Sequence, residues 1–356
     1  MMNIGNSARY RVINGHFSNF FSHIVYGKGT IEMVKSSFNK VLDTCIYMEK
    51  SIHITVYNDY SANTTVNIVD VLFSNVFTSN KIAGAIYCNN AQASFYLISS
   101  LFTNCTSGKS ENFANRGSVS SGAFVFYGKN AVLESNCFLE CTGVGYCFVY
   151  LIYSTQIHQI NMTSIMNCGK KYNPGFSFLS DYGNQIYSYM NSSHNVGNDA
   201  CVSGVPGSYG SLGGISFFNL VNNSGGLSIF GLGFSSNTIT AHSFNVVNNA
   251  PTTSIFMMWG NNFIFQNIIF IGNTNKVYAP VPYGSNGALT LQYCYSDTNY
   301  LGGCTIGTNV FSHVATLTKL EINIVNKCVD LIKLNTRAFS MRRTPIIFVL
   351  FYTQIL

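Results

Sequence analysis

The chain has 356 residues, of which 47% are hydrophobic and only 9% are charged, and its formal net charge is +6. An ordinary soluble domain has about 25% charged residues. A disordered chain combines low hydrophobicity with high net charge, so this composition excludes disorder. The sequence has no series of uninterrupted apolar stretches of about 20 residues, which excludes a bundle of transmembrane helices. The small, diffuse net charge argues against a nucleic-acid partner.

A degenerate motif returns along the chain: an aromatic residue, a small polar residue and an Asn, followed by a step of Gly and small apolar residues. Its clearest copy runs from Phe77 to Asn80 and continues from Gly84 to Tyr87. Self-similarity at a period of a few tens of residues indicates one supersecondary unit stacked many times. Further copies of its first half begin, in chain order, at Phe38, Phe73, Phe102, Phe234 and Phe270.

The segments between these positions are predicted to be short strands. Residues 124–127, 216–217 and 289–291 alternate aromatic or β-branched residues with others and are bounded by Gly, Asn and Ser. Capped segments with a helical period are missing. A unit of roughly 20 to 30 residues with two or three such strands has the size of one coil of a parallel β-helix. We therefore predict an all-β fold, a right-handed single-stranded parallel β-helix (solenoid), as one repeat domain over residues 1–335.

Asn is expected at the corners of each coil. It tolerates the left-handed backbone conformation that a sharp bend requires. Side-chain amides stacked in successive coils can also hydrogen-bond along the axis, as Asn ladders do in cross-β stacks. The length allows roughly 12 to 14 coils in one continuous solenoid.

The combination of Phe-x-x-Asn with Gly-Gly-Ala-Ile-type steps resembles the polymorphic membrane proteins, the adhesin and autotransporter passenger domains of chlamydiae. It is also similar to expanded sets of β-helix surface proteins in trichomonad protozoa. The resemblance is strongest from Phe77 to Tyr87, weaker from Phe234 to Asn273, and extends loosely from Phe17 to Cys328. Many copies have lost one half of the motif. The resemblance implies a right-handed, pectin-lyase-like β-helix with a role in surface display and adhesion.

The eleven Cys residues allow two interpretations. Cys105, Cys141, Cys168 and Cys328 are expected at equivalent positions of different coils. Because adjacent coils lie about 4.8 Å apart, these thiols could be stacked as small buried hydrophobes or joined as disulfides. The series Cys137-x3-Cys141-x5-Cys147 lacks a second cluster and a nearby His, so we expect no metal site and no cofactor.

Glycosylation sequons and the chain ends bear on localisation. On an exported protein, exposed Asn-x-Ser/Thr sites would be glycosylated. We favour Asn63 and Asn191, and expect Asn104 to be turned inward. Residues 1–19 lack the apolar stretch of a signal peptide, yet the resemblance implies a cell-surface or extracellular location. The candidate glycosylation sites are Asn63, Asn104, Asn161, Asn191 and Asn222.

Residues 336–356 form a basic and apolar C-terminal tail. Arg337, Arg342 and Arg343 precede an apolar segment at 345–352, which is shorter than the about 20 residues that span a bilayer. The tail is therefore either a truncated membrane anchor, the one membrane contact that we expect, or a last strand that caps the stack.

A parallel β-helix is also the scaffold of pectate lyases and polygalacturonases. Those activities need clustered carboxylates or Ca²⁺ with a basic residue, and this chain has 13 Asp and Glu residues in total. Asp181 and Asp199 are the weak catalytic candidates, and His158, His194 and His242 have no neighbouring acid in the sequence. A polysaccharide lyase or glycoside hydrolase remains the alternative function.

Binding is the better-supported class. Tyr offers apolar area with a polar tip at low entropic cost. We predict a non-enzymatic surface or secreted repeat protein that binds host-cell or extracellular glycans or proteins. A structural coat component that associates through its coil ends is a third possibility. The candidate binding aromatics each precede a Gly and are Tyr127, Tyr182, Tyr209 and Tyr283.

Overall fold

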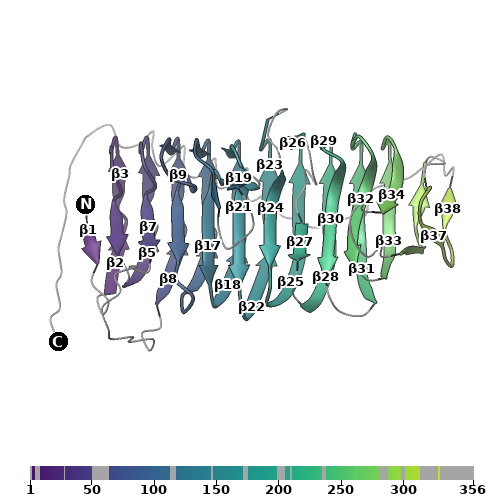
Figure 1. Cartoon of the computed structure of the whole chain (residues 1–356), viewed down its shortest axis with the longest axis horizontal. Coiled ribbons are helices and arrows are strands. Elements are labelled where there is room, and N and C mark those ends of the chain that lie inside the picture. The colour runs from purple at the N-terminus through teal and green to yellow at the C-terminus, as the bar shows by residue number, and fades with distance from the viewer. Residues whose placement is uncertain are drawn as a thin grey trace.

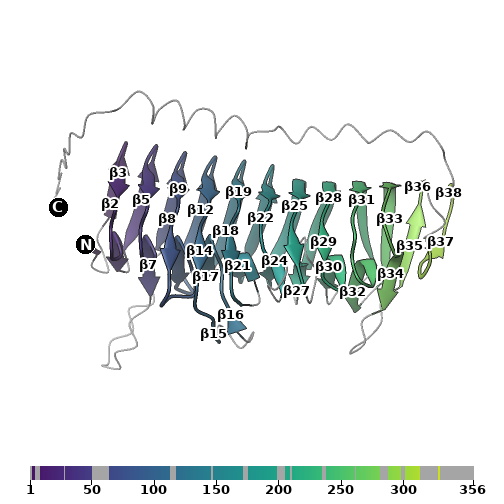
Figure 2. The same ribbon diagram turned by 90° about the horizontal axis from the view of Figure 1, so that it is seen from above.

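The strands of the protein lie side by side along one long axis in a computed structural model, from β1 (Met2–Ile4) to β38 (Phe311–Ser312) (Figures 1 and 2). Every regular element in the described part is a strand. The structure describes residues 2–4, 9–27, 29–49, 64–112, 118–145, 147–170, 175–198, 205–208, 211–234, 238–260, 262–280, 288–297 and 301–312, together with Cys328. The predicted tail, residues 336–356, lies outside these residues.

One wall of the solenoid is a parallel sheet, here called sheet A, to which successive coils add one strand each. A separate three-stranded parallel sheet, β30 (Ser228–Phe234), β32 (Ser254–Gly260) and β34 (Lys276–Pro280), follows later in the chain. The eight described strands of sheet A are β1, β4 (Val25–Gly27), β7 (Ile46–Glu49), β11 (Ile86–Asn89), β17 (Phe124–Gly128), β21 (Cys147–Ser154), β24 (Phe176–Asp181) and β27 (Val205–Ser208). The pairs of sheet A are parallel, and the register shifts within the two pairs β21–β24 and β24–β27.

The larger parallel sheet, here called sheet B, receives two strand segments from most coils. The first segments are β2 (Arg9–Ile13), β5 (Thr30–Val34), β8 (Thr65–Val69), β12 (Ser94–Ile98), β18 (Asn130–Glu134), β22 (Ile157–Asn161), β25 (Asn184–Ser193), β28 (Ser211–Val221), β31 (Ile239–Val247), β33 (Phe263–Ile271), β35 (Leu289–Gln292) and β37 (Thr305–Ile306).

The second segments of sheet B follow a corner in each coil. In β25, β28, β31 and β33 one long strand serves both segments. Elsewhere the second segments are β3 (His16–Ser18), β6 (Ser37–Asn39), β9 (Leu72–Ser74), β13 (Leu101–Thr103), β19 (Cys137–Leu139), β23 (Ser164–Met166), β36 (Tyr295–Ser296) and β38.

Short strands complete some coils. Parallel pairs join β10 (Phe77–Thr78), β14 (Thr106–Ser107) and β20 (Thr142–Gly143), and also β26 (Val196–Gly197) with β29 (Ser224–Gly225). Among the described strands, the one antiparallel pair is β15 (Glu111–Asn112) with β16 (Ser118–Val119). The predicted all-β parallel solenoid is therefore confirmed.

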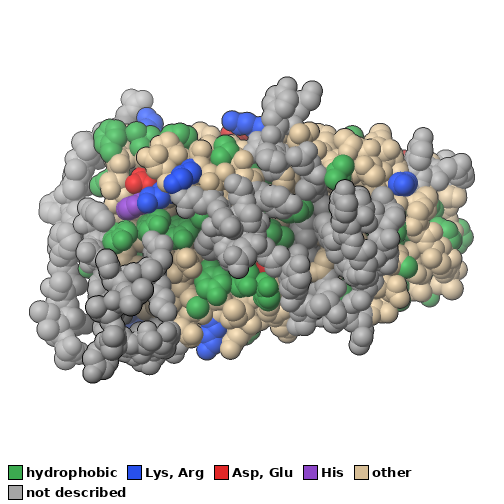
Figure 3. All heavy atoms as spheres, viewed as in Figure 1, with side chains coloured by type: hydrophobic (Ala, Val, Ile, Leu, Met, Phe, Trp, Pro, Cys, Tyr) green, Lys and Arg blue, Asp and Glu red, His purple; other side chains and the backbone are tan. Residues whose placement is uncertain are grey.

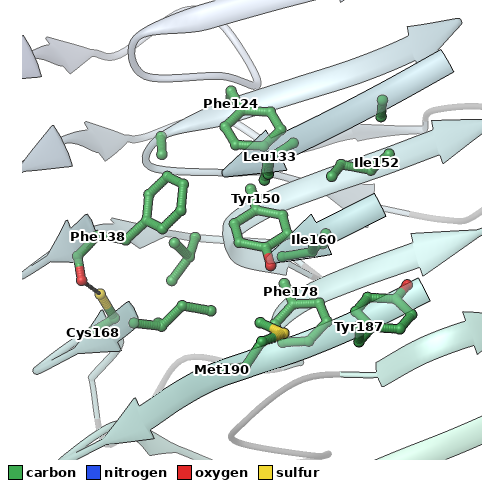
Figure 4. Close-up of a cluster of buried hydrophobic side chains, with 14 of the residues drawn as sticks. Phe124, Leu133, Phe138, Tyr150, Ile152, Ile160, Cys168, Phe178, Tyr187 and Met190 are labelled. Carbon is green, nitrogen blue, oxygen red and sulfur yellow. Dashed lines mark hydrogen bonds between the residues drawn. The ribbon is translucent and has the colours of Figure 1, made fainter. Parts of the chain in front are cut away.

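The Phe of the repeat points into the solenoid. Phe38, Phe73, Phe102 and Phe138 occupy the central position of successive second segments, and their ring centroids are 4.9, 4.6 and 5.0 Å apart. All four rings are fully buried. Burying one such side chain contributes about 1.5–3 kcal/mol, so the aromatic row is a main source of stability. Figure 4 shows the same kind of packing around Tyr150 and Phe178 in the middle coils.

The copy of the motif that is clearest in the sequence is not equivalent to the others. Phe73 stacks between Phe38 and Phe102, whereas Phe77 pairs with Thr106 in the short strand β10 and is 43% exposed. The equivalence of Phe77 with the buried Phe residues is therefore wrong. The physical reason is that this coil continues into a further strand after its corner at Asn75.

Each coil turns at corners whose residues have a positive φ. The corner that follows the second segment has φ values near those of a left-handed helix, and Asn holds it in most coils. This confirms the predicted role of Asn, because a short polar side chain tolerates that conformation best. The residues at this corner are Asn19, Lys40, Asn75, Asn104, Glu140, Asn167, His194, Asn222, Asn248 and Gly272.

A buried ladder of side chains follows these corners. The backbone N–H of Asn195 donates to Oδ1 of Asn223 at 3.0 Å, that of Asn223 to Asn249 at 3.0 Å, and that of Asn249 to Asn273 at 2.9 Å. Each amide nitrogen also donates to a backbone carbonyl of the preceding coil, as Asn223 does to Ser192 at 2.9 Å. The predicted axial Asn ladder is confirmed.

Thiols take the place of the amides in the earlier coils. Cys105, Cys141 and Cys168 are free and buried. Their Sγ atoms contact the carbonyl oxygens of Phe73, Phe102 and Phe138 of the preceding coil at 3.6–3.7 Å. The interpretation of these thiols as stacked buried groups is confirmed.

Cys328 does not belong to this ladder, so its predicted equivalence with the other three is wrong. It forms a disulfide with Cys137, 191 residues away. Cys137 lies on the opposite side of its strand from the buried Phe138, and the disulfide packs with Leu72 and Leu101 on the outer side of sheet B. The pairing brings distant parts of the chain together, which no local spacing could indicate.

Candidate functional site: the outer face of sheet A

A row of Tyr residues lies on the outer face of sheet A at its N-terminal end. Strand pairing places Tyr26 opposite Tyr47 and Tyr47 opposite Tyr87. Their rings are stacked, with centroids 5.7 and 4.6 Å apart. The residues that flank them in the strands, such as Ile46 and Met48, are part of the solenoid core, so alternation directs the Tyr rings outward.

His23 extends this row. Its ring lies 4.9 Å from that of Tyr47. Its Nδ1 donates to the backbone carbonyl of Thr44 at 2.8 Å and lies 3.6 Å from a carboxylate oxygen of Asp43. On the other side, Nζ of Lys81 lies 4.7 Å from the centre of the Tyr47 ring, a cation–π contact. The site thus combines aromatic area with one imidazole, one carboxylate and one ammonium group.

A second group of Tyr residues continues the outer face in the middle coils. The rings of Tyr127 and Tyr153 are 4.9 Å apart, and those of Tyr153 and Tyr182 are 4.5 Å apart. The structure therefore brings together two predicted aromatics, Tyr127 and Tyr182, through a third that the sequence did not single out. Tyr209 and Tyr283 belong to the part of the chain that the structure does not describe.

The two groups differ in how their rings pack. In the first group the rings are nearly parallel, with interplanar angles of 6° and 21°, so each ring covers the face of its neighbour. In the second group the rings are tilted by 42° and 40°. Figure 3 views this side of the molecule, where hydrophobic side chains gather beside a few charged ones over the N-terminal and middle coils. Tyr26 is 39% exposed, whereas Tyr87 is only 6% exposed. The other four rings are half-buried, so a ligand on this surface would meet parts of them and of Tyr26.

No family model, curated protein or solved structure matches this chain. The geometry of the fold and of its surfaces must therefore support any assignment of function.

Asp181, one of the two weak catalytic candidates, ends β24 opposite Tyr153 and is fully buried. Burial, followed by the negative charge of Asp181, raises the pKa of the Cys147 thiol. A buried carboxylate is not placed to reach a polysaccharide. Asp199 falls outside the described residues. In the described ranges no group of three or more His, Cys, Asp or Glu could hold a metal ion.

The three His residues examined as possible bases are in different environments. His158 is fully buried inside the solenoid, and burial lowers its pKa to about 3. His194 is exposed at a corner, where the side-chain amide of Asn222 donates to its Nε2 at 2.9 Å. His242 contacts the hydroxyl of Ser243 through Nδ1 at 3.1 Å. The sequence did not indicate the contact between His23 and Asp43, because the two residues come from adjacent coils. Predicting it would have required the number of residues in that coil.

The described sequon residues all lie on the surface or half-buried. Asn104 is exposed rather than turned inward, and its amide donates to Oδ1 of Asn75 at 2.8 Å. Asn161 accepts a hydrogen bond from Ser188 at 2.9 Å, and Asn191 donates to Ser193 at 3.4 Å. Asn63 is outside the described residues. Within the described part, no helix is long and apolar enough to cross a membrane.

Proposed function

We propose that this chain is a non-enzymatic surface or secreted β-helix repeat protein that binds extracellular glycans or proteins on the outer face of sheet A. The observation that supports the proposal most strongly is the set of outward Tyr rings that keep exposed area on successive coils, Tyr26 and Tyr47 followed by Tyr127 and Tyr153. Rigid aromatic side chains with polar tips give contact area at low entropic cost, which suits recognition.

Two further features are consistent with an exported protein. The Cys137–Cys328 disulfide is of a kind that persists in oxidising compartments. The exposed sequon at Asn104 would accept a glycan there. The likeness of the repeat to the chlamydial and trichomonad surface proteins points in the same direction, toward adhesion to host-cell ligands.

The alternative of a polysaccharide lyase or glycoside hydrolase has one supporting observation, the His23 and Asp43 pair beside Lys81. An imidazole held by a carboxylate can act as a base. Within the described residues, the pair of His23 and Asp43 is not part of a group of three or more His, Cys, Asp or Glu that could hold a metal ion. Binding without turnover therefore remains the better proposal.

The proposal predicts that removal of outward rings weakens binding. We expect the double variant Tyr26→Ala/Tyr153→Ala to bind cells or immobilised extracellular glycans and proteins at least 10-fold more weakly than the wild type. The reason is that it removes one ring from each of the two Tyr groups. Tyr96→Ala, which removes a half-buried ring from the other wall on β12, is the matched control. The measurement is the binding of labelled protein to cells and to a glycan and matrix-protein array.

Two results would speak against this function. Equal binding by the double variant and the wild type would remove the outer face of sheet A as the site. Release of unsaturated or reducing sugars from polysaccharides by the wild type, abolished in His23→Ala, would replace binding with catalysis.

A further inference from the structure

The described strands of sheet B in its later coils carry no charged side chain. The five consecutive strands β25, β28, β31, β33 and β35 contain no Asp, Glu, Lys or Arg. Earlier strands of the same sheet do carry charges, such as Arg9 and Arg11 paired with Glu32.

Two aromatic residues on the outer side of sheet B in these later coils have an unfavourable backbone conformation. Tyr189 and Phe217 occupy the same corner in adjacent coils, with φ values of 52° and 59°. Small or polar residues hold this corner in most other coils, among them Asn14, Ser99 and Ser243. A bulky side chain in the left-handed region is a genuine outlier, and such outliers cluster at ligand-binding positions.

The two rings are arranged as a pair. The centroids of Tyr189 and Phe217 are 4.6 Å apart with an interplanar angle of 9°, and His242 of the next coil meets Phe217 edge-on at 5.3 Å. Both aromatic side chains are half-buried, so part of each ring remains exposed. Farther along the same corner row, Tyr293 also has a positive φ of 53° and is 44% exposed.

Two consecutive Gly residues of β28, Gly213 and Gly214, precede Phe217, and the place where their side chains are missing is here called the Gly213–Gly214 notch. The register between β25 and β28 shifts between Gln185 and Ile186, which leaves Gly213 as the extra residue of a bulge. The next residue, Gly214, pairs with Ile186, and a Cβ at Gly214 would meet nothing within 4 Å. A Gly with open space inside a strand marks a place where another molecule can approach the backbone.

Polar groups that suit uncharged hydroxyls line the rest of this side. Strand pairing places Ser216, His242, Gln266 and Gln292 in one row across four coils. The amide of Gln266 donates to Oε1 of Gln292 at 2.9 Å, which fixes both side chains. Hydroxyl, imidazole and amide groups both donate and accept hydrogen bonds, as sugar hydroxyls do.

We propose that this side, formed by the Tyr189–Phe217 pair, the Gly213–Gly214 notch and the row from Ser216 to Gln292, binds a neutral glycan along the solenoid axis. The absence of charge excludes the acidic glycans, which need cationic partners. The aromatic pair provides an apolar edge and the polar row provides hydrogen bonds. The site is separate from the outer face of sheet A and goes beyond the function proposed there.

The test uses variants that should not harm the fold. Phe217→Asn places at the corner a residue that tolerates a positive φ, and Gly214→Leu fills the open notch. We expect each variant to bind immobilised neutral β-glucan, mannan or galactan oligosaccharides at least 10-fold more weakly than the wild type. The melting temperature should be unchanged or higher for Phe217→Asn. Ser99→Asn, at the same corner in an earlier coil outside the proposed site, is the control and should bind as the wild type does.

Other outcomes overturn the proposal. One is binding of the wild type to polygalacturonate but not to neutral glycans. Another is binding as tight as the wild type by both Phe217→Asn and Gly214→Leu. A third is a lower melting temperature of Phe217→Asn, which would show that the ring serves packing. If Tyr26→Ala/Tyr153→Ala abolishes binding to neutral glycans and Phe217→Asn does not, the site on sheet B is ruled out while the proposed function on sheet A stands. The reverse pattern would leave this site in place and remove the one on sheet A.

Discussion

Replacing Asn223 with Ala is expected to lower the free energy of unfolding by about 3–5 kcal/mol. The side chain donates to the carbonyl of Ser192 and to Oδ1 of Asn249, and it accepts from the backbone N–H of Asn195. All of these groups are buried, and each buried group left unsatisfied costs about 1–3 kcal/mol. The measurement is the shift in the urea or guanidinium unfolding curve of the oxidised protein.

Two variants of the same corner serve as controls. Asn222→Ala changes the half-buried neighbour with a φ of 54° and should cost about 1 kcal/mol, the strain of a left-handed Ala. Asn223→Cys introduces the side chain that three earlier coils use at this position, so its cost should fall between the two. Equal losses of unfolding free energy in Asn223→Ala and Asn222→Ala would show that the hydrogen bonds of the buried ladder do not stabilise the fold.

Acid is expected to destabilise the protein through His158. Burial lowers the pKa of this imidazole to about 3, against about 6.5 in an unfolded chain. The unfolded state takes up the proton at a higher pH than the folded state, so protonation of His158 favours unfolding. The stability that depends on a neutral His158 is therefore fully present above about pH 6.5. It is lost as the pH falls from 6.5 toward 3, and with 1.36 kcal/mol per unit the full loss is about 5 kcal/mol.

The variant His158→Leu isolates this effect from the other titrating groups. Neither ring nitrogen of His158 has a hydrogen-bond partner among the described residues, and the ring lies 5.7 Å from that of Tyr187. We expect the variant to be as stable as the wild type or more so at pH 7, and to lose less stability between pH 6.5 and 4 in denaturant titrations. A parallel loss of stability in both proteins over that range would exclude His158 as the acid-sensitive group.

Much of the fold could be predicted from the sequence, because a solenoid repeats the same local requirements in every coil. The corner Asn residues are visible since few other residues accept a positive φ, and the buried Phe residues precede them at a nearly fixed distance. The copy at Phe77 is an exception, because its ring is 43% exposed. The short strand after the corner at Asn75 has a sequence similar to that of the strand before it. The motif alone therefore does not show whether Phe73 or Phe77 faces inward.

The candidate surfaces were less predictable because they depend on the length of each coil. Tyr26 and Tyr47 are 21 residues apart, whereas Tyr47 and Tyr87 are 40 apart, although both pairs are neighbours in the sheet. No single period aligns these three residues. The same variation hid Tyr153, the contact of His23 with Asp43, and the notch at Gly214, which arises from a shift in register.

The alignment of coils across segments of unequal length is the claim on which both proposed surfaces depend. It can be tested by disulfide cross-linking of the double variant Tyr47→Cys/Tyr87→Cys. The variant is made in two backgrounds, one with the native Cys88 and one with Cys88→Ser. Residues opposite each other in adjacent parallel strands lie about 5 Å apart, within disulfide range. The structure predicts rapid oxidation between positions 47 and 87 in the folded protein. A disulfide between position 47 and the native Cys88 instead, which pairs with Met48 in the structure, would show a register shifted by one residue and would contradict the account.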